Sequence, residues 1–433
     1  MKRLLGLLLA VAALVVSRAN AADTKLPNVV LIVSDDHAWT DYSFMGHDQI
    51  KTPHLDKLAA QSMTFRRCYV PSSLCCPSLA TIITGLHPQQ HKVTSNDPPI
   101  PMGVKPGEFQ KSAAFADGRE VMNRHLEAVP TLPRVLGAQG YLSLQTGKWW
   151  QGNFKRGGFT HGMTKGLRHG DEGLEIGRKT MQPIFDFIST AKSEQKPFMV
   201  WYAPMMPHDP HTPPERLLAK YRDKTPSLHV AKYWAMVEWF DETCGQLLDH
   251  LDQQGVADNT IVIYVTDNGW IQNPEAPRYA ARSKRSPYDG GLRTPLMVRW
   301  SSKIKPQMRD DLVMSLDIMP TLLAAIGQKP TAQMQGLNLL DDNAVKARTT
   351  IQGACFTHNA VDLNDPRRNV ENRWIIDGDF KLIVPGSNPT EPQRPELFDI
   401  KSDPFEKSDL SAQQPEVMKR LTAKLDAWWD PSK

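Results

Sequence analysis

Runs dominated by hydrophobic residues recur along the chain at the length of a β-strand. They cover residues 28–34, 198–203 and 260–266, and polar or proline-containing segments follow them. Such runs, without alternation of polar and apolar residues, are typical of strands buried on both faces of a parallel sheet. Residues 141–146 and 295–300 are two further candidates. The pattern predicts an α/β fold with a mostly parallel central sheet.

Hydrophobic residues with helical spacing lie between several of these strands. The spacing is clearest over residues 233–251, and residues 316–326 form a second predicted helix. A short apolar helix is expected between Pro77, which loses no helical hydrogen bond in a first turn, and Gly85, which suits a C-terminal end. Residues 131–133 open another helix.

The last part of the chain has shorter elements. Residues 373–383 are predicted to form a hairpin with an Asp-Gly turn, followed by a strand at 396–400 and a closing helix at 415–429. A polar stretch separates this part from the rest. The predicted organisation is a signal peptide over 1–21, a large domain over 22–326, a connector over 327–348 and a small α+β subdomain over 349–433.

The first 21 residues have the pattern of a secretory signal peptide. Lys2 and Arg3 precede an apolar run over 4–16, and the Ala-Asn-Ala sequence at 19–21 suits a cleavage site. The run is short for a bilayer span, and no second long apolar segment follows. We therefore expect a mature chain without a membrane span that is periplasmic or secreted.

Composition and charge narrow the class of protein. The 433 residues are 40% hydrophobic and 23% charged, which is typical of a globular chain. A net charge of +4, spread along the chain, gives no support for nucleic-acid binding but is compatible with a polyanionic substrate. Five scattered cysteines allow at most one or two disulfide bridges, and their spacing matches no zinc site.

Oxygen-bearing side chains follow two of the predicted central strands. Asp35 and Asp36 come after the first strand, and Asp267 and Asn268 come after the run that ends at residue 266. Ligand sites in α/β sheets lie at the carboxyl ends of strands, and adjacent carboxylates repel each other unless a cation lies between them. Hard oxygen ligands suit calcium or magnesium. An isolated Asp-Asp pair is more often a turn or a helix cap, so the metal prediction also depends on the neighbouring motifs.

Several short motifs occur in order along the chain. Besides the two Asp-containing pairs, they are Cys75-x-Pro77-Ser78 followed by Thr84-Gly85, Gly147-Lys148-Trp149, Pro207-His208, and Lys284-x-x-x-Tyr288-Asp289-Gly290-Gly291-x-Arg293-x-Pro295. This set resembles the sulfatase family, whose signature cysteine is oxidised to formylglycine. The run over 87–97 and the double cysteine look most like the glycosaminoglycan and glucosamine-6-sulfate branch. The resemblance covers almost the whole mature chain.

The resemblance implies a fold and an activity. The fold would be an alkaline-phosphatase-like sandwich, with its catalytic domain over 22–326. The activity would be that of a sulfuric ester hydrolase, releasing sulfate from a sulfated sugar or polysaccharide. A formylglycine-generating maturase would convert Cys75. One calcium ion would then be bound by Asp35, Asp36, the modified Cys75, Asp267 and Asn268, because an Asp-Asn pair fits a single hard cation better than the Asp-His pair of phosphatases.

The same resemblance assigns roles to the remaining motif residues. Lys148 and Lys284 would neutralise sulfate oxygens, and His208 would protonate the oxygen of the leaving sugar. A cysteine at the N-terminal end of a helix also gains from the free N–H groups and the helix dipole. The resemblance therefore makes Cys75 the nucleophile, Lys148 and Lys284 the sulfate-binding cations, and His208 the proton donor.

Two positions depart from the family pattern. Leu79 stands where the family has an arginine that braces the nucleophile, and Trp150 stands where it has a histidine that assists sulfate release. A non-catalytic descendant that still binds sulfated glycans is therefore an alternative from another class. A phosphoester hydrolase of the same superfamily is a third possibility, but it would use a second metal site for which the sequence shows no ligands.

Overall fold

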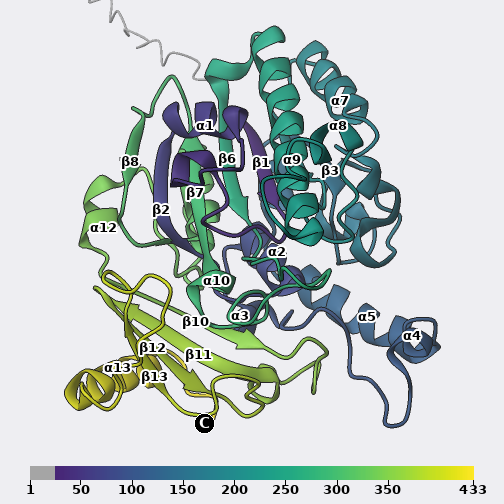
Figure 1. Cartoon of the computed structure of the whole chain (residues 1–433). Coiled ribbons are helices and arrows are strands. Elements are labelled where there is room, and N and C mark those ends of the chain that lie inside the picture. Colours follow the sequence, from purple (N-terminus) through teal and green to yellow (C-terminus); the bar gives the residue numbers. More distant parts are fainter. Residues whose placement is uncertain (1–24) are drawn as a thin grey trace, which may run out of the picture.

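The computed structural model describes residues 25–433, so the signal peptide predicted over 1–21 lies outside the described residues. The chain is built on two β-sheets, a large mixed sheet covered by helices and a smaller antiparallel sheet beside it (Figure 1). Between residues 25 and 433, no helix combines the length and hydrophobicity needed to cross a membrane.

The large sheet has nine strands. They are β1 (Asn28–Ser34), β2 (Met63–Tyr69), β3 (Leu142–Gly147), β4 (His161–Gly162), β5 (Phe198–Ala203), β6 (Thr260–Thr266), β7 (Arg293–Arg299), β8 (Gln307–Arg309) and β9 (Val313–Met314). Their order is β4-β3-β5-β1-β6-β7-β2-β8, and β9 pairs with β2. β1 is parallel to both β5 and β6, whereas β7 is antiparallel to β6 and β2.

Helices lie on both faces of this sheet, and the chain has thirteen α-helices between residues 25 and 433. They are α1 (Pro53–Ala60), α2 (Cys75–Thr84), α3 (Pro88–His91), α4 (Pro106–Phe109), α5 (Ala113–Glu127), α6 (Leu132–Gly137), α7 (Gln182–Ser193), α8 (Glu215–Leu218), α9 (Leu228–Gln253), α10 (Asp289–Leu292), α11 (Ile318–Ala325), α12 (Asp342–Ala347) and α13 (Pro415–Trp428). Short 3-10 turns cover η1 (Ser43–Met45), η2 (Phe154–Gly157), η3 (Arg168–Glu175), η4 (Ala257–Asn259), η5 (Ser315–Asp317) and η6 (Pro366–Asn369).

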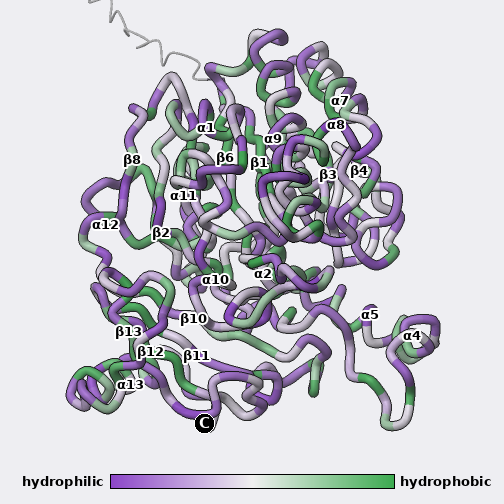
Figure 2. The backbone as a smooth tube through the Cα atoms, viewed as in Figure 1, coloured by the Kyte–Doolittle hydropathy of each residue, from purple (hydrophilic) through white to green (hydrophobic). Residues whose placement is uncertain are grey.

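The central strands separate two hydrophobic cores. Every residue of β1, β5 and β6 is buried, which explains their continuous hydrophobic sequences. Val29 and Leu31 pack on the side of α2, α5 and α11, whereas Val30 and Ile32 pack on the side of α1, α7 and α9. Figure 2 shows the hydrophobic residues gathered along these strands. The period of two along a strand thus fills both layers of the sandwich.

The small sheet is antiparallel throughout. It consists of β10 (Thr350–Phe356), β11 (Val370–Asp377), β12 (Phe380–Pro385) and β13 (Glu396–Asp399), in that order. Gly378 turns the β11–β12 hairpin at φ +65°, a conformation that favours glycine. Leu421 and Leu425 of α13 pack against this sheet. Trp374 and Phe398 share a core with Tyr69 of the large sheet and join the two sheets.

The structure confirms the predicted fold class and most predicted elements. β1, β5 and β6 match the predicted strands, and Gly85 ends α2 at φ +68° as expected. The sequence did not predict β2, β10, α5 or α7. All five cysteines are free and buried, so none of the disulfide bridges considered possible is formed. The domain limits stay a prediction.

Candidate active site

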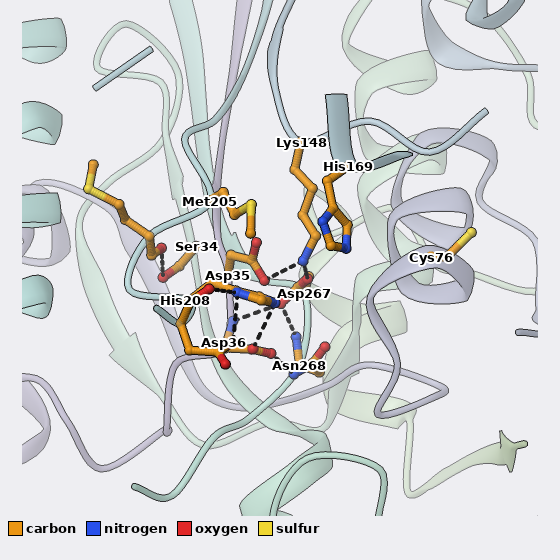
Figure 3. A network of polar contacts seen from close by, with 12 residues as sticks. Ser34, Asp35, Asp36, Cys76, Lys148, His169, Met205, His208, Asp267 and Asn268 are labelled. Carbon is orange, nitrogen blue, oxygen red and sulfur yellow. Dashed lines mark hydrogen bonds and ion pairs between the residues drawn. The ribbon is translucent and has the colours of Figure 1, made fainter. Parts of the chain in front are cut away.

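Two neighbouring strands bring four oxygen-bearing side chains to one place. β1 and β6 are paired up to their last residues, Ser34 and Thr266, so the residues that follow both strands emerge side by side. Successive side chains of a strand point to opposite faces, but the backbone of Asp36 turns into the left-handed region at φ +59°. All the predicted oxygen ligands are at most 1% exposed and meet in one network (Figure 3): Asp35, Asp36, Asp267 and Asn268.

This network leaves three buried oxygens without a hydrogen-bond partner. The backbone N–H of Asp36 donates to Oδ1 of Asp267 at 3.1 Å, and Nδ2 of Asn268 donates to Oδ1 of Asp36 at 2.6 Å. The oxygens without a partner are Oδ2 of Asp35, Oδ2 of Asp267 and Oδ1 of Asn268. Buried polar atoms are almost always paired, so this donor set fits a hard cation held by carboxylate and amide oxygens.

Two lysines contact these carboxylates. Lys148 follows Gly147, where a Cβ would lie 1.8 Å from the carbonyl oxygen of Ala203, so that only glycine fits this close approach. Nζ of Lys148 lies 2.6 Å from Oδ1 of Asp35, and Nζ of Lys284 lies 2.7 Å from Oδ2 of Asp36. Burial disfavours both charges, but the surrounding carboxylates raise the pKa of each lysine. Both ammonium groups are therefore charged and fixed in position.

Cys75 begins α2 beside this network. One ligand atom from each of Asp35, Asp36, Cys75 and His208 lies within 4.8 Å of the others. Burial raises the pKa of the Cys75 thiol, but Lys148 and Lys284 outweigh this effect and lower it to about 7. Cys75 therefore forms a thiolate more readily than an ordinary buried cysteine does.

Cys76 has a different environment. Its side chain points away from the network (Figure 3), and Nε2 of Gln151 lies 3.0 Å from its sulfur. Burial raises the pKa of Cys76 to about 11. The two adjacent cysteines are therefore chemically distinct, because only the pKa of Cys75 is lowered.

His208 completes the group of predicted site residues. Its Nε2 lies 3.3 Å from Oδ2 of Asp36, and its Nδ1 lies 3.0 Å from Oδ1 of Asp209. Burial disfavours the charged imidazole, but Asp36 and Asp35 raise the pKa of His208 to about 10. The imidazole is therefore protonated at neutral pH and can donate a proton. The structure thus brings together every residue predicted for the site.

Three of the predicted site residues, Cys75, His208 and Lys284, line a cavity of about 320 Å³. Its wall also carries three arginines and one carboxylate, with aromatic, amide and imidazole groups between them: Asn96, Arg168, His169, Asp209, Trp270, Arg278, Tyr279, Arg285 and His358. The excess of cationic side chains favours an anionic ligand.

Arg168 and His169 are site residues that the sequence did not indicate. They begin η3, and His169 adopts φ +70° while its carbonyl oxygen accepts a hydrogen bond from the Trp149 N–H at 3.0 Å. Arg168 is held by two hydrogen bonds to Asp97 at 3.0 and 2.9 Å. The only local signal is a histidine next to a glycine in a polar loop, which is too common to identify a site.

Of the two departures from the family motifs, Trp150 contacts residues of this wall, whereas Leu79 lies in the hydrophobic core. Leu79 is 2% exposed and belongs to the core beneath α2. Trp150 is 1% exposed, and the guanidinium groups of Arg119 and Arg168 lie over its ring, at 5.4 and 4.8 Å from the ring centroid. Trp150 also meets the ring of His169 edge-on at 4.5 Å. An imidazole from another loop therefore lies beside the position where the family has a histidine.

A cysteine at a helix N-terminus, two buried ammonium groups and an oxygen-rich cluster at the edge of a parallel sheet define a hydrolase site for an anionic ester. Residues 27–328 match the sequence profile described as Sulfatase, and residues 279–429 match the profile described as N-sulphoglucosamine sulphohydrolase, C-terminal. The chain belongs to the sulfatase family and is a sulfuric ester hydrolase.

Curated relatives agree with this assignment. An N-acetylgalactosamine-6-O-sulfatase of Bacteroides thetaiotaomicron is 24% identical over 523 residues, covering 95% of each chain. Arylsulfatase A of Homo sapiens is 28% identical over 376 residues, covering 74% of this chain and 68% of the relative. The predicted likeness to glycosaminoglycan sulfatases is thereby confirmed.

Solved structures confirm the alkaline-phosphatase-like fold. The crystal structure of Ps i-CgsB has a TM-score of 0.73 at 21% identity, covering 94% of this chain and 93% of that chain. A protein in complex with its substrate D-glucosamine-2-N,6-O-disulfate has a TM-score of 0.72 at 19% identity, covering 94% and 98%. A phosphonate monoester hydrolase of Agrobacterium radiobacter also shares the fold, with a TM-score of 0.69 at 17% identity, covering 93% and 95%. The fold alone therefore does not select the ester, whereas the sequence profile does.

Proposed function

We propose that the chain releases sulfate from a sulfated carbohydrate, with Cys75 converted to formylglycine and one calcium ion in the adjacent oxygen cluster. The observation that carries the proposal is the set of three unpartnered buried oxygens next to Cys75 and two fixed lysines. Relatives named for sulfated amino sugars support the substrate class. The predicted signal peptide supports a periplasmic or secreted location, where polymeric glycans are accessible.

Calcium fits the donor set of the cluster. Asp35, Asp36, Asp267 and Asn268 offer only oxygens to a cation, and calcium accepts carboxylate and amide oxygens in flexible geometry. The unmodified thiol of Cys75 is a poor ligand for such a hard cation, whereas an oxygen at the same position would extend the set. A bound cation would also offset the repulsion among three carboxylates.

A formylglycine at position 75, once hydrated, would supply an oxygen nucleophile for the sulfur atom of the ester. The chain's own residues would prepare the substrate for it. Lys148 and Lys284 carry fixed positive charge beside Cys75 and would neutralise the sulfate oxygens. His208, whose Nε2 lies 3.3 Å from Oδ2 of Asp36, would give its proton to the oxygen of the leaving sugar.

His169 supplies the imidazole that position 150 lacks. Burial lowers the pKa of His169, and the nearby cations Arg168, Lys148, His208 and Lys284 lower it further. Its ring is therefore neutral, and its Nε2 accepts a hydrogen bond from Nη1 of Arg168 at 2.8 Å, so that Nδ1 carries the proton and can donate to an oxygen in the cavity. The catalytic domain proposed over 22–326 contributes this group, and His358 of the subdomain proposed over 349–433 completes the wall.

The test is sulfate release by the full chain produced with a formylglycine-generating maturase. Ion chromatography should detect sulfate from at least one member of a panel of sulfated sugars in the presence of calcium. A Cys75→Ala variant should release none. An aldehyde-reactive probe should label the tryptic peptide over 68–92 in the wild type only.

Three outcomes would contradict the proposal. Binding of sulfated sugars without sulfate release would favour a non-catalytic glycan-binding protein. Faster hydrolysis of phosphate esters than of sulfate esters would favour a phosphoester hydrolase. Full sulfatase activity without aldehyde labelling would show that Cys75 acts without conversion.

A further inference from the structure

A second cavity lies next to the active-site cavity. Its volume is about 570 Å³, within the range of about 300–1,000 Å³ typical of ligand pockets. Phe115 and Arg119 of α5 line one side, and Leu167 and Arg168 line the other. In Figure 1, α4 and α5 form an arm that stands out from the body of the molecule. No step of the proposed reaction uses this cavity.

One layer of side chains separates the two cavities. Arg168 lines both of them. Trp150 lines the second cavity, and its ring contacts that of His169, which lines the first. A ligand longer than one sugar residue, reacting in the first cavity, could therefore extend towards the second.

The second cavity has unmet hydrogen-bonding capacity. Nε1 of Trp150, a donor, and Oδ1 of Asn123, an acceptor, have no hydrogen-bond partner. Both residues line the cavity, and they are only 1% and 8% exposed. A buried donor and a buried acceptor without partners suit a ligand that offers both functions, as a sugar hydroxyl does.

The charge of the lining is positive after internal pairs are discounted. Glu120 is paired with Arg156 and Arg124, and Arg168 is paired with Asp97. Between residues 25 and 433, Lys111 and Arg119 have no carboxylate partner. Leu167, which is 70% exposed, adds an apolar surface on which a sugar face can pack. An anionic carbohydrate complements this combination.

We propose that this cavity is a subsite for the sugar residues adjacent to the sulfated residue. The preferred substrate is then an anionic oligosaccharide or polysaccharide rather than a sulfated monosaccharide. The identity of the occupant rests on the proposed function, because the subsite would extend the substrate of that same active site.

Calorimetric titration of the full chain tests this subsite. The chain is used with unconverted Cys75, so that no ligand is consumed. The probes are a monosaccharide and a tetrasaccharide from each of chondroitin 6-sulfate, heparan sulfate and κ-carrageenan. In at least one series the tetrasaccharide should bind about tenfold more tightly. Lys111→Glu should remove most of that preference, whereas Lys303→Glu, an equal charge change beside a separate cavity near β8, should keep it.

The outcomes separate this inference from the proposed function. Equal affinity for short and long sugars in all three series would overturn the subsite, even if sulfate release is observed. An unchanged preference in Lys111→Glu would overturn it as well. A length preference that depends on Lys111, found in a chain that never releases sulfate, would support the subsite while contradicting the hydrolase proposal.

Discussion

Two buried charge clusters in this molecule look alike by composition but differ in their pairing. The active-site cluster contains Asp35, Asp36, Lys148, Asp267 and Asn268. The interface cluster joins the two sheets and contains Tyr69, Asp289, Lys381 and Glu406. Both are almost fully excluded from solvent.

Every carboxylate oxygen of the interface cluster has an ammonium, hydroxyl or N–H group within 3.0 Å, although Oε1 of Glu406 makes only an ion pair and no hydrogen bond. Asp289 accepts from Nζ of Lys381 at 2.8 Å and from the Tyr69 hydroxyl at 3.0 Å. Glu406 lies 2.8 Å from Nζ of Lys381 and accepts from the Asp289 N–H at 2.6 Å. The active-site cluster instead keeps three oxygens without a hydrogen bond, and Nζ of Lys148 lies 3.5 Å from one of them, Oδ2 of Asp267.

The difference indicates which cluster is functional. Burying a charge is costly unless it is paired, so a cluster that serves only stability should satisfy its oxygens internally, as the interface cluster does. Oxygens left without donors are suited to a cation that the chain itself does not provide. Three oxygens without a hydrogen bond, against one in the interface cluster, distinguish the site from the structural cluster better than burial or charge alone.

The largest expected effect comes from breaking the interface cluster. Lys381→Met leaves Asp289 and Glu406 without their shared cation, and removing one partner of a buried pair costs about 3–5 kcal/mol. Urea denaturation should show this loss in the free energy of unfolding, and calcium should not restore it. Lys401→Met, at an exposed lysine of the same subdomain, should change the free energy little. An equal loss of unfolding free energy in both variants would show that the buried ion pairs of the interface cluster contribute no more to stability than an exposed lysine.

The corresponding change in the active-site cluster should act on the reaction. Lys148→Met removes a positive charge that we propose neutralises the sulfate oxygens, and losing such a group costs about 10²–10³ in rate. Sulfate-release kinetics should show this decrease in kcat/KM, with the variant still folded by circular dichroism. A decrease of less than tenfold in a folded variant would rule out the role proposed for Lys148.

The sequence predicted the active-site cluster but not the interface cluster. Asp35 and Asp267 each follow a continuous hydrophobic run, so their strands and their place at the carboxyl edge could be inferred. Lys381 and Glu406 follow no comparable pattern, because their partner Asp289 lies about a hundred residues away and only the packing of the two sheets brings them together. The order of motifs along the chain was enough to predict the active-site cluster. The pairing of residues far apart in the sequence, as in the interface cluster, could be seen only in the folded structure.

The missed elements have similar causes. β2 contains Arg66 and Arg67 in the middle of the strand, which interrupt the hydrophobic pattern where the strand bulges. His169 lies in a loop in which Gly170 has a positive φ. The carboxylate of Asp171 accepts hydrogen bonds from four backbone N–H groups of this loop. Such a loop has no periodicity, so no local rule could have placed the histidine at the site.

Calcium should stabilise the active-site cluster only. A ligand that binds the folded state alone raises the free energy of unfolding by about 2.7 kcal/mol at 100 times its dissociation constant. Thermal unfolding with and without calcium should show this gain in the wild type and its loss in Asp267→Ala. Asp310→Ala, at an exposed aspartate paired with Arg66, should keep the response. If calcium still stabilised the Asp267→Ala variant, the cation would bind at a site other than the active-site cluster.

The smallest effect expected is a pH dependence of the interface cluster. Burial raises the pKa of Glu406 to about 7, although Lys381 acts in the opposite direction. Since the folded state holds this proton more tightly than the unfolded state, the contribution of Glu406 is fully present below pH 4.5 and is lost as the pH rises through about 7. Urea midpoints at pH 4.5 and 7.5 should therefore fall further in the wild type than in Glu406→Gln, which cannot titrate there. The difference should amount to at least about 1 kcal/mol, the equivalent of one pKa unit. Equal pH dependence in both proteins would mean that Glu406 is ionised throughout, with Lys381 compensating its burial completely.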